Sequence, residues 1–337
     1  MDRKDEIILQ QMDLIRSMTE RNLRSMDTDF WGTPLMEKKT NQPPISEKSE
    51  KPASQSQAAK PEEKEEIPPK EKIEDLLAEL DSYVGMDAIK AEVRSLINMV
   101  QVYKLRREHD LPTTDMSLHM VFSGNPGTGK TTIARLVAKY LKAIGALKGG
   151  QLVEVSRGDL VGRYTGHTAP LTSSVIESAL GGVLFIDEAY SLYRGEQDSF
   201  GLEAIDTLVK GMEDHRDELV VILAGYTKEM ETFLTANSGL ASRFPNKIEF
   251  PDYTADELLQ ITHVLAKSKG YTLAESCNEP LRSYYARRQT ADARTAGNGR
   301  LARNTLEKAI FHQSRRLVAE PAAALDVLLP SDLELEE

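Results

Sequence analysis

The sequence is poor in cysteine and has no long apolar run, and each absence limits what the protein can be. Cys277 is the single cysteine among 337 residues, so no disulfide can form within the chain, and a reducing compartment fits this usage. No apolar stretch approaches the ~18 residues that span a bilayer, and the charged N-terminus lacks the apolar core of a signal peptide. We therefore expect a cytoplasmic protein with no membrane partner.

Clustered metal ligands and excess positive charge are also missing. The six histidines are scattered, and no group of histidine, cysteine and carboxylate residues has the spacing of a metal site. The net charge of -11 gives the whole chain no electrostatic attraction to nucleic acid or to anionic lipid. Nucleic acid is therefore disfavoured as a partner, although a local basic groove is compatible with this charge.

Two segments precede the part of the chain that reads as folded. Apolar residues recur at helical spacing near the N-terminus, at Ile8, Met12, Ile15 and Met18. They predict an amphipathic helix within residues 1–31, which either docks as an adaptor on this chain or a partner, or stays solvated without one. Residues 32–70 are rich in proline, serine, lysine and glutamate from residue 40 onward, which predicts a flexible linker.

Apolar strands separated by helical patterns follow over residues 71–251. The strands are expected at 120–122, 152–156, 182–187, 219–224 and 247–250. Their apolar residues do not alternate with polar ones, which is typical of a parallel sheet covered by helices on both faces. Beyond Pro251 no strand is evident, and helices are expected at 254–269, 278–288 and 299–317. The predicted fold is an α/β domain followed by a small all-α domain over residues 252–330.

A glycine-rich segment follows the first expected strand. Gly124 to Thr131 fits the pattern G-x-x-x-x-G-K-[ST], and a helix follows it. Glycines let successive backbone N–H groups turn toward a phosphate, and the helix N-terminus adds positive potential. Lys130 is placed to meet the β- and γ-phosphates, and the Thr131 hydroxyl is placed to hold Mg²⁺. The segment predicts a nucleoside triphosphate site formed by Asn125, Pro126, Gly127, Thr128, Gly129, Lys130, Thr131 and Thr132.

Two carboxylates follow the third expected strand, which is the apolar run before Asp187. Ligands of parallel sheets bind at the carboxyl ends of the strands, so both carboxylates are expected in the nucleotide site. Asp187 can hold Mg²⁺, and Glu188 can orient the attacking water or accept its proton. The pair favours hydrolysis over transfer of the phosphoryl group to a second substrate.

These motifs together resemble AAA+ ATPases, and more closely the group that includes red-type Rubisco activase and stage V sporulation protein K. The closer likeness is carried by the phrases at 124–132, 160–170, 185–192, 223–226, 242–244 and 297–300. It covers roughly residues 72–320 and leaves residues 1–70 without a counterpart. It implies an ATP hydrolase that uses Mg²⁺ and assembles into a ring of six copies.

The resemblance also implies roles for single residues. Arg243 matches the arginine finger, which reaches the ATP of a neighbouring subunit; without the family it would read as a surface ion pair. Arg300 matches the arginine that reports nucleotide state to the helical domain, and Arg303, one turn on, competes for that role. Val84 and Gly85 fall where the family encloses adenine.

Two tyrosines complete the expected site. Tyr164, in Gly162-Arg-Tyr-Thr-Gly166, matches a residue that relatives present to a central pore to grip a polypeptide; the alternative is a tyrosine packed under its own loop. Tyr226 stands where many AAA+ proteins have an asparagine that positions water. The Tyr226 hydroxyl, Thr227 and Glu188 are all candidates for that task.

The function that these residues predict is the ATP-driven remodelling of a client protein whose identity the sequence does not give. Relatives serve targets as different as a carbon-fixing enzyme and sporulation factors. One alternative is a nucleic-acid motor or clamp-loader-like ATPase. Another is a GTP switch, because the run from Asn246 to Glu249 faintly resembles the guanine-reading N-K-x-D. A third is a scaffold that binds ATP without hydrolysing it.

Overall fold

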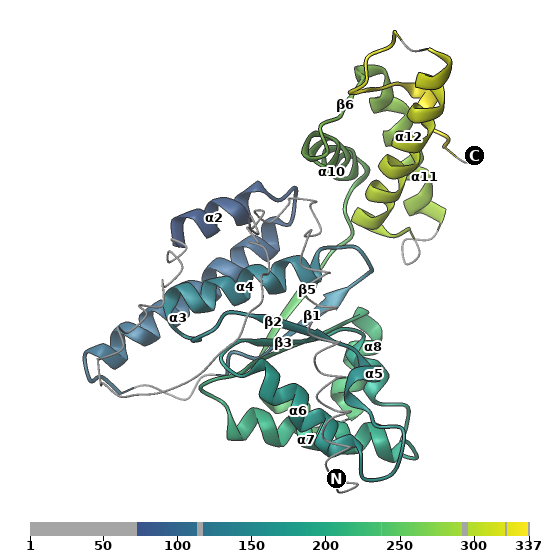
Figure 1. Ribbon diagram of the computed structural model, residues 1–337. Helices are drawn as coiled ribbons and strands as arrows, with labels where there is room; N and C mark the ends of the chain where they lie inside the picture. Colours follow the sequence, from purple (N-terminus) through teal and green to yellow (C-terminus); the bar gives the residue numbers. More distant parts are fainter. Residues whose placement is uncertain (1–72, 113–116, 237, 292–295, 321, 336–337) are drawn as a thin grey trace, which may run out of the picture.

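The computed structural model describes residues 73–112, 117–236, 238–291, 296–320 and 322–335 (Figure 1). The helix expected within residues 1–31 and the linker expected at 32–70 lie outside the described residues. Within the described part of the chain, the α/β domain and the helical domain are both present, and this confirms the predicted fold class.

A five-stranded parallel sheet forms the centre of the α/β domain. Its strands are β1 (Met120–Gly124), β2 (Leu152–Val155), β3 (Val183–Ile186), β4 (Val220–Gly225) and β5 (Asn246–Phe250). They lie in the order β2-β3-β4-β1-β5, and Met120 of β1 pairs with Ile222 of β4 and with Asn246 of β5. Because all strands point the same way, the segments after β1, β3 and β4 emerge at one edge of the sheet.

Helices cover both faces of the sheet (Figure 1). One face carries α2 (Ile73–Ser82), α3 (Asp87–Glu108) and α4 (Lys130–Ile144). The other carries α5 (Arg157–Leu160), α6 (Thr168–Ala179), α7 (Ser199–Asp214) and α8 (Thr227–Ala236), with α9 (Ser238–Arg243) following α8. Neighbouring strand residues enter different cores: Phe122 packs with α4, and Val121 packs with α7 and α8. Burial on both faces explains why the strands read as continuous apolar runs.

The C-terminal domain consists of α10 (Ala255–Ser268), α11 (Asn278–Ala291) and α12 (Asn298–Ala319), and we call it the lid. The expectation that no strand follows Pro251 is wrong in one detail. β6 (Thr272–Leu273) and β7 (Val327–Leu328) form a short parallel ladder at the end of the lid. Strands of two residues are too short to show a periodic pattern, so only the contact between distant segments reveals them.

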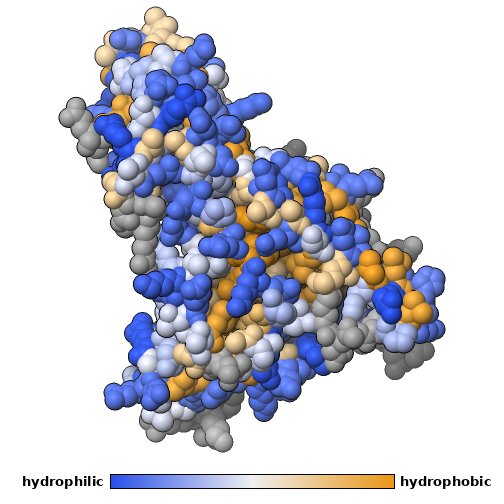
Figure 2. Space-filling model, turned by 180° about the vertical axis from the view of Figure 1, so that it is seen from behind, coloured by the Kyte–Doolittle hydropathy of each residue, from blue (hydrophilic) through white to orange (hydrophobic). Residues whose placement is uncertain are grey.

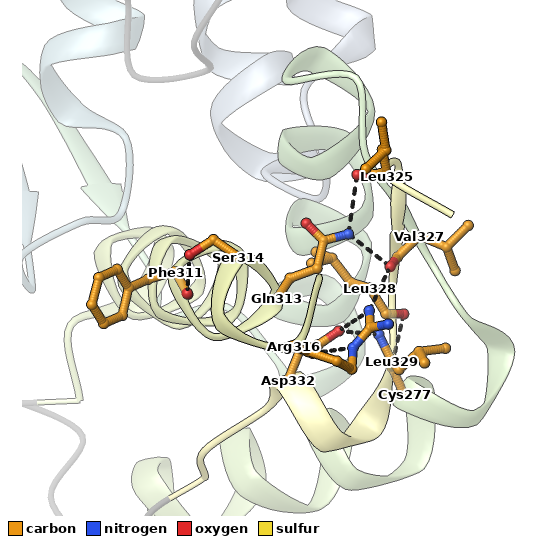
Figure 3. Close-up of polar contacts among 10 residues, drawn as sticks. All are labelled: Cys277, Phe311, Gln313, Ser314, Arg316, Leu325, Val327, Leu328, Leu329 and Asp332. Atoms are coloured by element: carbon orange, nitrogen blue, oxygen red, sulfur yellow. Dashed lines mark hydrogen bonds and ion pairs between the residues drawn. The ribbon is translucent and has the colours of Figure 1, made fainter. Parts of the chain in front are cut away.

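Side chains of α12 hold the C-terminal segment against the lid (Figure 3). Gln313 donates hydrogen bonds to the carbonyl groups of Leu325 and Val327, at 3.1 and 2.8 Å. Arg316 donates to both carboxylate oxygens of Asp332, at 2.8 and 2.9 Å. Burial opposes ionisation of Asp332, but the Arg316 guanidinium holds the pKa of this carboxyl below its ordinary value. The buried Cys277 lies at this ladder, which supports a structural role for its thiol.

The surface of the described chain is mostly hydrophilic in the view of Figure 2, with apolar side chains in a band across the middle of the view and also near the end of α3 away from the lid. The exposed apolar residues of this region are Met99, Val102, Leu105 and Leu111. Helices long and apolar enough to cross a bilayer do not occur in the ranges given above.

Candidate functional site

A cavity of about 280 Å³ lies at the carboxyl edge of the sheet, between the α/β domain and the lid. Four segments that are far apart in the sequence meet there: the glycine loop after β1, the end of β3, the end of β4 and the start of α12. The lining residues are Gly124, Pro126, Gly127, Gly129, Lys130, Thr131, Thr132, Arg135, Asp187, Glu188, Gly225, Tyr226, Arg300 and Arg303.

The glycine loop has the backbone geometry of an anion site. Gly127 and Gly129 have φ angles of 75° and 97°, which favour glycine, and α4 begins at Lys130 directly after them. The first N–H groups of α4 have no partner within the helix, and the helix dipole places positive potential at this end. The loop and the helix start can therefore accept a phosphate.

Lys130 is held inside this loop. Its Nζ donates hydrogen bonds to the carbonyl groups of Gly124 and Asn125, both at 2.8 Å. Burial lowers the pKa of Lys130 to about 8; Asp187 opposes this effect and Arg300 adds to it. A cation with little solvent around it binds an incoming phosphate oxygen strongly, because that oxygen replaces missing hydration.

Asp187 and Glu188 follow β3 directly and both line the cavity. The Asp187 N–H donates to the Val155 carbonyl at 2.9 Å, and Asp187 Oδ1 accepts from the Glu188 N–H at 3.0 Å. Glu188 has a φ of 49°, an uncommon conformation for a residue other than glycine. Such strain is typical of functional sites, and here it turns the second carboxylate out of the strand direction into the cavity.

The oxygen ligands around Asp187 suit a hard cation such as Mg²⁺. In the part of the chain that the structure describes, no group of three or more His, Cys, Asp or Glu residues could hold a metal alone. The Thr131 hydroxyl and the Asp187 carboxylate would supply two ligands, and phosphate oxygens and water would supply the rest. Mg²⁺ usually binds in this way, through one or two protein groups and the phosphates of its substrate.

Tyr226 brings an aromatic ring to the cavity at the end of β4. Its ring lies 5.8 Å from that of Tyr190, in the turn that follows Glu188. A Cβ atom at Gly225 would lie 2.7 Å from the Tyr190 ring, so glycine is needed for this approach. Burial, with Glu188 nearby, raises the pKa of Tyr190 to about 12. Tyr226 thus lines the same cavity as the two carboxylates, beside the turn that follows Glu188.

Three arginines line the cavity, and the sequence motifs anticipated two of them. Arg300 and Arg303 both extend from the first turns of α12, so the geometry keeps both candidates for the lid arginine. Arg135 was not anticipated. It lies on α4 four residues after Thr131, and residues at this spacing share one face of a helix. That spacing is the signal that would have found it.

Four predicted nucleotide-binding residues do not line the cavity. The Asn125 amide donates to the Asp252 carboxylate at 2.9 Å, and the buried Thr128 hydroxyl donates to the Asn125 carbonyl at 2.9 Å. Val84 and Gly85 lie outside the lining residues as well, and a Cβ atom at Gly85 would lie 2.1 Å from a Glu257 carboxylate oxygen. The first turn of α10 therefore packs against the region expected to enclose adenine.

Arg243 and Tyr164 also lie apart from the cavity. Arg243, at the end of α9, forms an ion pair with Glu213 at 2.9 Å and donates to the Gly239 carbonyl at 3.0 Å. Tyr164 is 70% exposed, in the loop between α5 and α6, and its ring and that of His167 form a T-shaped pair 5.7 Å apart. The tyrosine is therefore not packed under its own loop.

The structure disfavours the alternative of a guanine-reading motif at Asn246. The Asn246 side chain donates hydrogen bonds to the carbonyl groups of Ser117 and His119, at 3.0 and 3.1 Å. These contacts join β5 to the chain around the start of β1. Asn246 lies at the beginning of its strand, at the edge of the sheet opposite the cavity, so it cannot contact a base bound there.

Comparisons with known proteins agree with this geometry. A profile for the ATPase family associated with various cellular activities (AAA) matches residues 120–252, and a profile for the AAA lid domain matches residues 254–337. Stage V sporulation protein K of Bacillus subtilis is 44% identical over 77% of this chain and 80% of that protein. The chloroplastic ribulose bisphosphate carboxylase/oxygenase activase of Cyanidioschyzon merolae is 42% identical over 75% of this chain and 87% of that protein.

A solved structure shows the same fold at low sequence identity. The AAA domain of FIGL-1 in complex with ADP has a TM-score of 0.52 and 18% identity, covering 78% of this chain and 89% of that one.

Proposed function

Because this chain belongs to the AAA ATPase family, we propose that it remodels a client protein through a central pore, as a ring of six copies that hydrolyse ATP at their interfaces. The observation that carries this proposal is the cavity that joins the glycine loop, two carboxylates and two lid arginines. A site of this composition binds a triphosphate and responds to it through the lid. One of the two relatives named above is, by its name, an activase of another enzyme, ribulose bisphosphate carboxylase/oxygenase.

The cavity residues that the sequence motifs predicted have proposed tasks. The loop N–H groups and Lys130 bind the phosphates, and Thr131 and Asp187 hold Mg²⁺, which neutralises charge on the phosphate oxygens when bound. Glu188 orients the attacking water or accepts its proton. Tyr226, beside Tyr190, is the group that replaces the usual asparagine. Arg300 contacts the phosphates from the lid, with Arg303 as the competing candidate.

Arg243 acts in this proposal from the neighbouring copy. In the single chain it does not line the cavity of its own subunit, so a role in hydrolysis requires a second subunit. An arginine that reaches the γ-phosphate in trans accelerates hydrolysis by about 10³–10⁵-fold. Exposed apolar side chains support association, because clusters of such side chains often mark interaction surfaces: Met99, Val102 and Leu105 on α3, and Leu111 just after it.

The remaining segments serve the client in this proposal. Tyr164 is exposed and belongs to a loop whose base is closed by a hydrogen bond from the Gly162 N–H to the Thr168 hydroxyl at 3.2 Å. A side chain presented in this way can grip an unfolded polypeptide. Residues 1–31 would act as an adaptor tethered by residues 32–70, with the nucleotide-binding domain at 71–251 and the lid at 252–330.

The Glu188→Gln variant tests the proposal most directly. We expect this variant to bind ATP, to accumulate as an assembled ring and to lose turnover, because the amide cannot accept a proton. Glu196→Gln, an exposed glutamate nearby, is the matched control and keeps full turnover. Hydrolysis at the wild-type rate in the Glu188→Gln variant, or a wild-type protein that stays monomeric with saturating ATP and still hydrolyses it, contradicts the proposal.

A further inference from the structure

A carboxylate at the junction of the two domains joins the glycine loop to the lid. Asp252 lies between β5 and α10. Its oxygens accept hydrogen bonds from the Asn125 amide at 3.0 and 2.9 Å, and Oδ1 also accepts from the Asn298 amide at 2.8 Å. Asn125 belongs to the glycine loop and Asn298 is the first residue of α12. One acceptor thus holds two amides from different domains.

Asn298 is the most constrained member of this cluster. It is 2% exposed and has a φ of 47°, which asparagine tolerates better than most residues. Its Oδ1 accepts from the Tyr253 N–H at 3.0 Å, and its amide also donates to the Pro126 carbonyl at 3.3 Å. Both ends of the side chain are therefore used, and neither aspartate nor alanine can replace all of these bonds.

The backbone of α12 rests directly on the glycine loop beside this cluster. The Gly299 N–H donates to the Gly127 carbonyl at 3.0 Å. A Cβ atom at Gly127 would lie 2.2 Å from the Gly297 carbonyl oxygen, so no other residue at Gly127 allows the approach. The glycine loop and the first turn of α12 are therefore in direct contact. A movement of the loop on binding phosphate would act directly on that turn.

The two lid arginines follow Asn298 on the same helix. Arg300 and Arg303 line the cavity, two and five residues further along α12. The direction of a helix is set by how its first turn is held, and here Asn298 and Gly299 provide the contacts with the α/β domain. These contacts therefore help to place both arginine side chains at the cavity.

We propose that Asn298 is a positioning residue for ATP hydrolysis, which through Asp252 couples the glycine loop to the angle of the lid. The inference rests on the proposed role of the cavity as the ATP site. When phosphates draw the loop N–H groups toward them, the Asn125–Asp252–Asn298 contacts carry the shift to α12. Arg300 and Arg303 then close on the nucleotide.

The decisive experiment uses a charge exchange in the full chain. Asn298→Asp places a second carboxylate beside Asp252 and removes the amide donor. We expect kcat for ATP to fall by up to about 100-fold, the size of effect that a small misplacement of groups around the reacting atoms can have. Hydrogen exchange at the Gly299 amide should become faster in the nucleotide-bound protein. Combining Asn298→Asp with Asp252→Asn restores one donor and one acceptor, and kcat should return to within a few fold of the wild-type value.

Controls separate this inference from a folding defect and from the proposed function. Asn298→Gly suits the backbone angle but lacks the amide, so it should fold and show the same loss of kcat. Asn278→Asp changes a lid asparagine whose side chain contacts His263, and it should keep kcat unchanged.

If the wild-type protein hydrolyses ATP and Asn298→Asp retains full kcat and slow exchange at Gly299, the inference is wrong. Failure of the double variant to recover, although folded, also overturns it. A wild-type protein that neither binds nor hydrolyses ATP would instead refute the proposed function.

Discussion

Arg157 and Asp198 form a two-point ion pair at the start of α5, the short helix that precedes the loop carrying Tyr164. The guanidinium nitrogens lie 2.7 and 3.0 Å from the two carboxylate oxygens, and the side chains are only 17% and 14% exposed. Arg157 also donates to the Ser191 carbonyl at 2.8 Å, and Asp198 accepts from the Gly201 N–H at the start of α7. The pair therefore joins α5, the turn after Glu188 and α7.

Breaking this pair should destabilise the α/β domain. We expect Arg157→Ala to lower the free energy of unfolding by about 3 kcal/mol, because it leaves a largely buried carboxylate without its partner. Urea unfolding followed by circular dichroism measures the change. Lys148→Ala removes one partner of the exposed pair with Glu218 and should cause no measurable change. Equal stability of the Arg157→Ala variant and the wild type would contradict this prediction.

The same pair makes stability depend on pH in the acid range. The hydrogen bond from Arg157 holds the pKa of Asp198 below its ordinary value, although burial opposes this. A lowered carboxyl pKa contributes stability above the unfolded pKa of about 3.9, and this contribution is lost as pH falls toward the folded pKa. The free energy of unfolding of the Asp198→Asn variant should therefore fall less steeply with decreasing pH, below pH about 4, than that of the wild type.

Arg243 should act on the ATP of a neighbouring subunit. Arg243→Ala and Glu188→Gln are each expected to be inactive alone, because each lacks one half of every catalytic centre. Mixed rings contain sites with Glu188 from one variant and Arg243 from the other, so mixing should restore roughly a quarter of wild-type turnover. Glu213→Gln, which removes the intrachain partner of Arg243, should keep turnover. Mixtures that stay inactive although they co-assemble would place the arginine in its own subunit's site.

Tyr164 should matter for polypeptides and not for basal hydrolysis. Tyr164→Ala is expected to hydrolyse ATP at the wild-type rate without added protein, because the side chain lies away from the cavity. With unfolded casein as the probe, wild-type turnover should rise and that of the alanine variant should not. Tyr164→Phe keeps the aromatic ring and should retain the response. Equal stimulation of the wild type and the alanine variant would remove Tyr164 from this role.

The affinity for ATP should fall as pH rises through 8. Burial lowers the pKa of Lys130 to about 8 in the free protein, and only the protonated amine attracts phosphate. Binding must then take up a proton above this pH, and Kd should increase by up to about tenfold per pH unit. Calorimetric titration between pH 7 and 9, in two buffers of different ionisation enthalpy, measures both Kd and proton uptake. Lys130→Ala should bind weakly with a flat pH profile, and a wild-type Kd that does not change over this range would contradict the prediction.

Tyr140 offers a test of core energetics. Its hydroxyl is buried and has no hydrogen-bond partner among the described residues. Tyr140→Phe should leave stability unchanged or raise it by about 1 kcal/mol, since no bond is lost and a desolvated polar group is removed. Tyr285→Phe is the matched control, because that hydroxyl bonds Thr262 at 2.8 Å, and it should lower stability by about 1 kcal/mol. A clear loss of stability in Tyr140→Phe would show that its hydroxyl has a partner in solution.

Most elements and most of the residues that line the cavity follow from local sequence. The glycine loop, the strand before Asp187 and the lid helices were predicted within a few residues of their bounds. Glycine angles and helical periodicity depend on residues within a turn or two of each other, so a single segment specifies them. The two-residue strands β6 and β7 and the cavity-lining Arg135 were missed, because neither has a pattern of its own.

The sequence by itself determined that a triphosphate loop and two carboxylates exist, since each motif is complete within about ten residues. Only the tertiary structure decided which groups stand around them. The strand order β2-β3-β4-β1-β5 places the loop after β1 beside Tyr226, and Asp252 binds amides 127 and 46 residues away. Contacts at such separations depend on how the sheet and the lid pack together. The conformational preferences of short segments do not specify that packing.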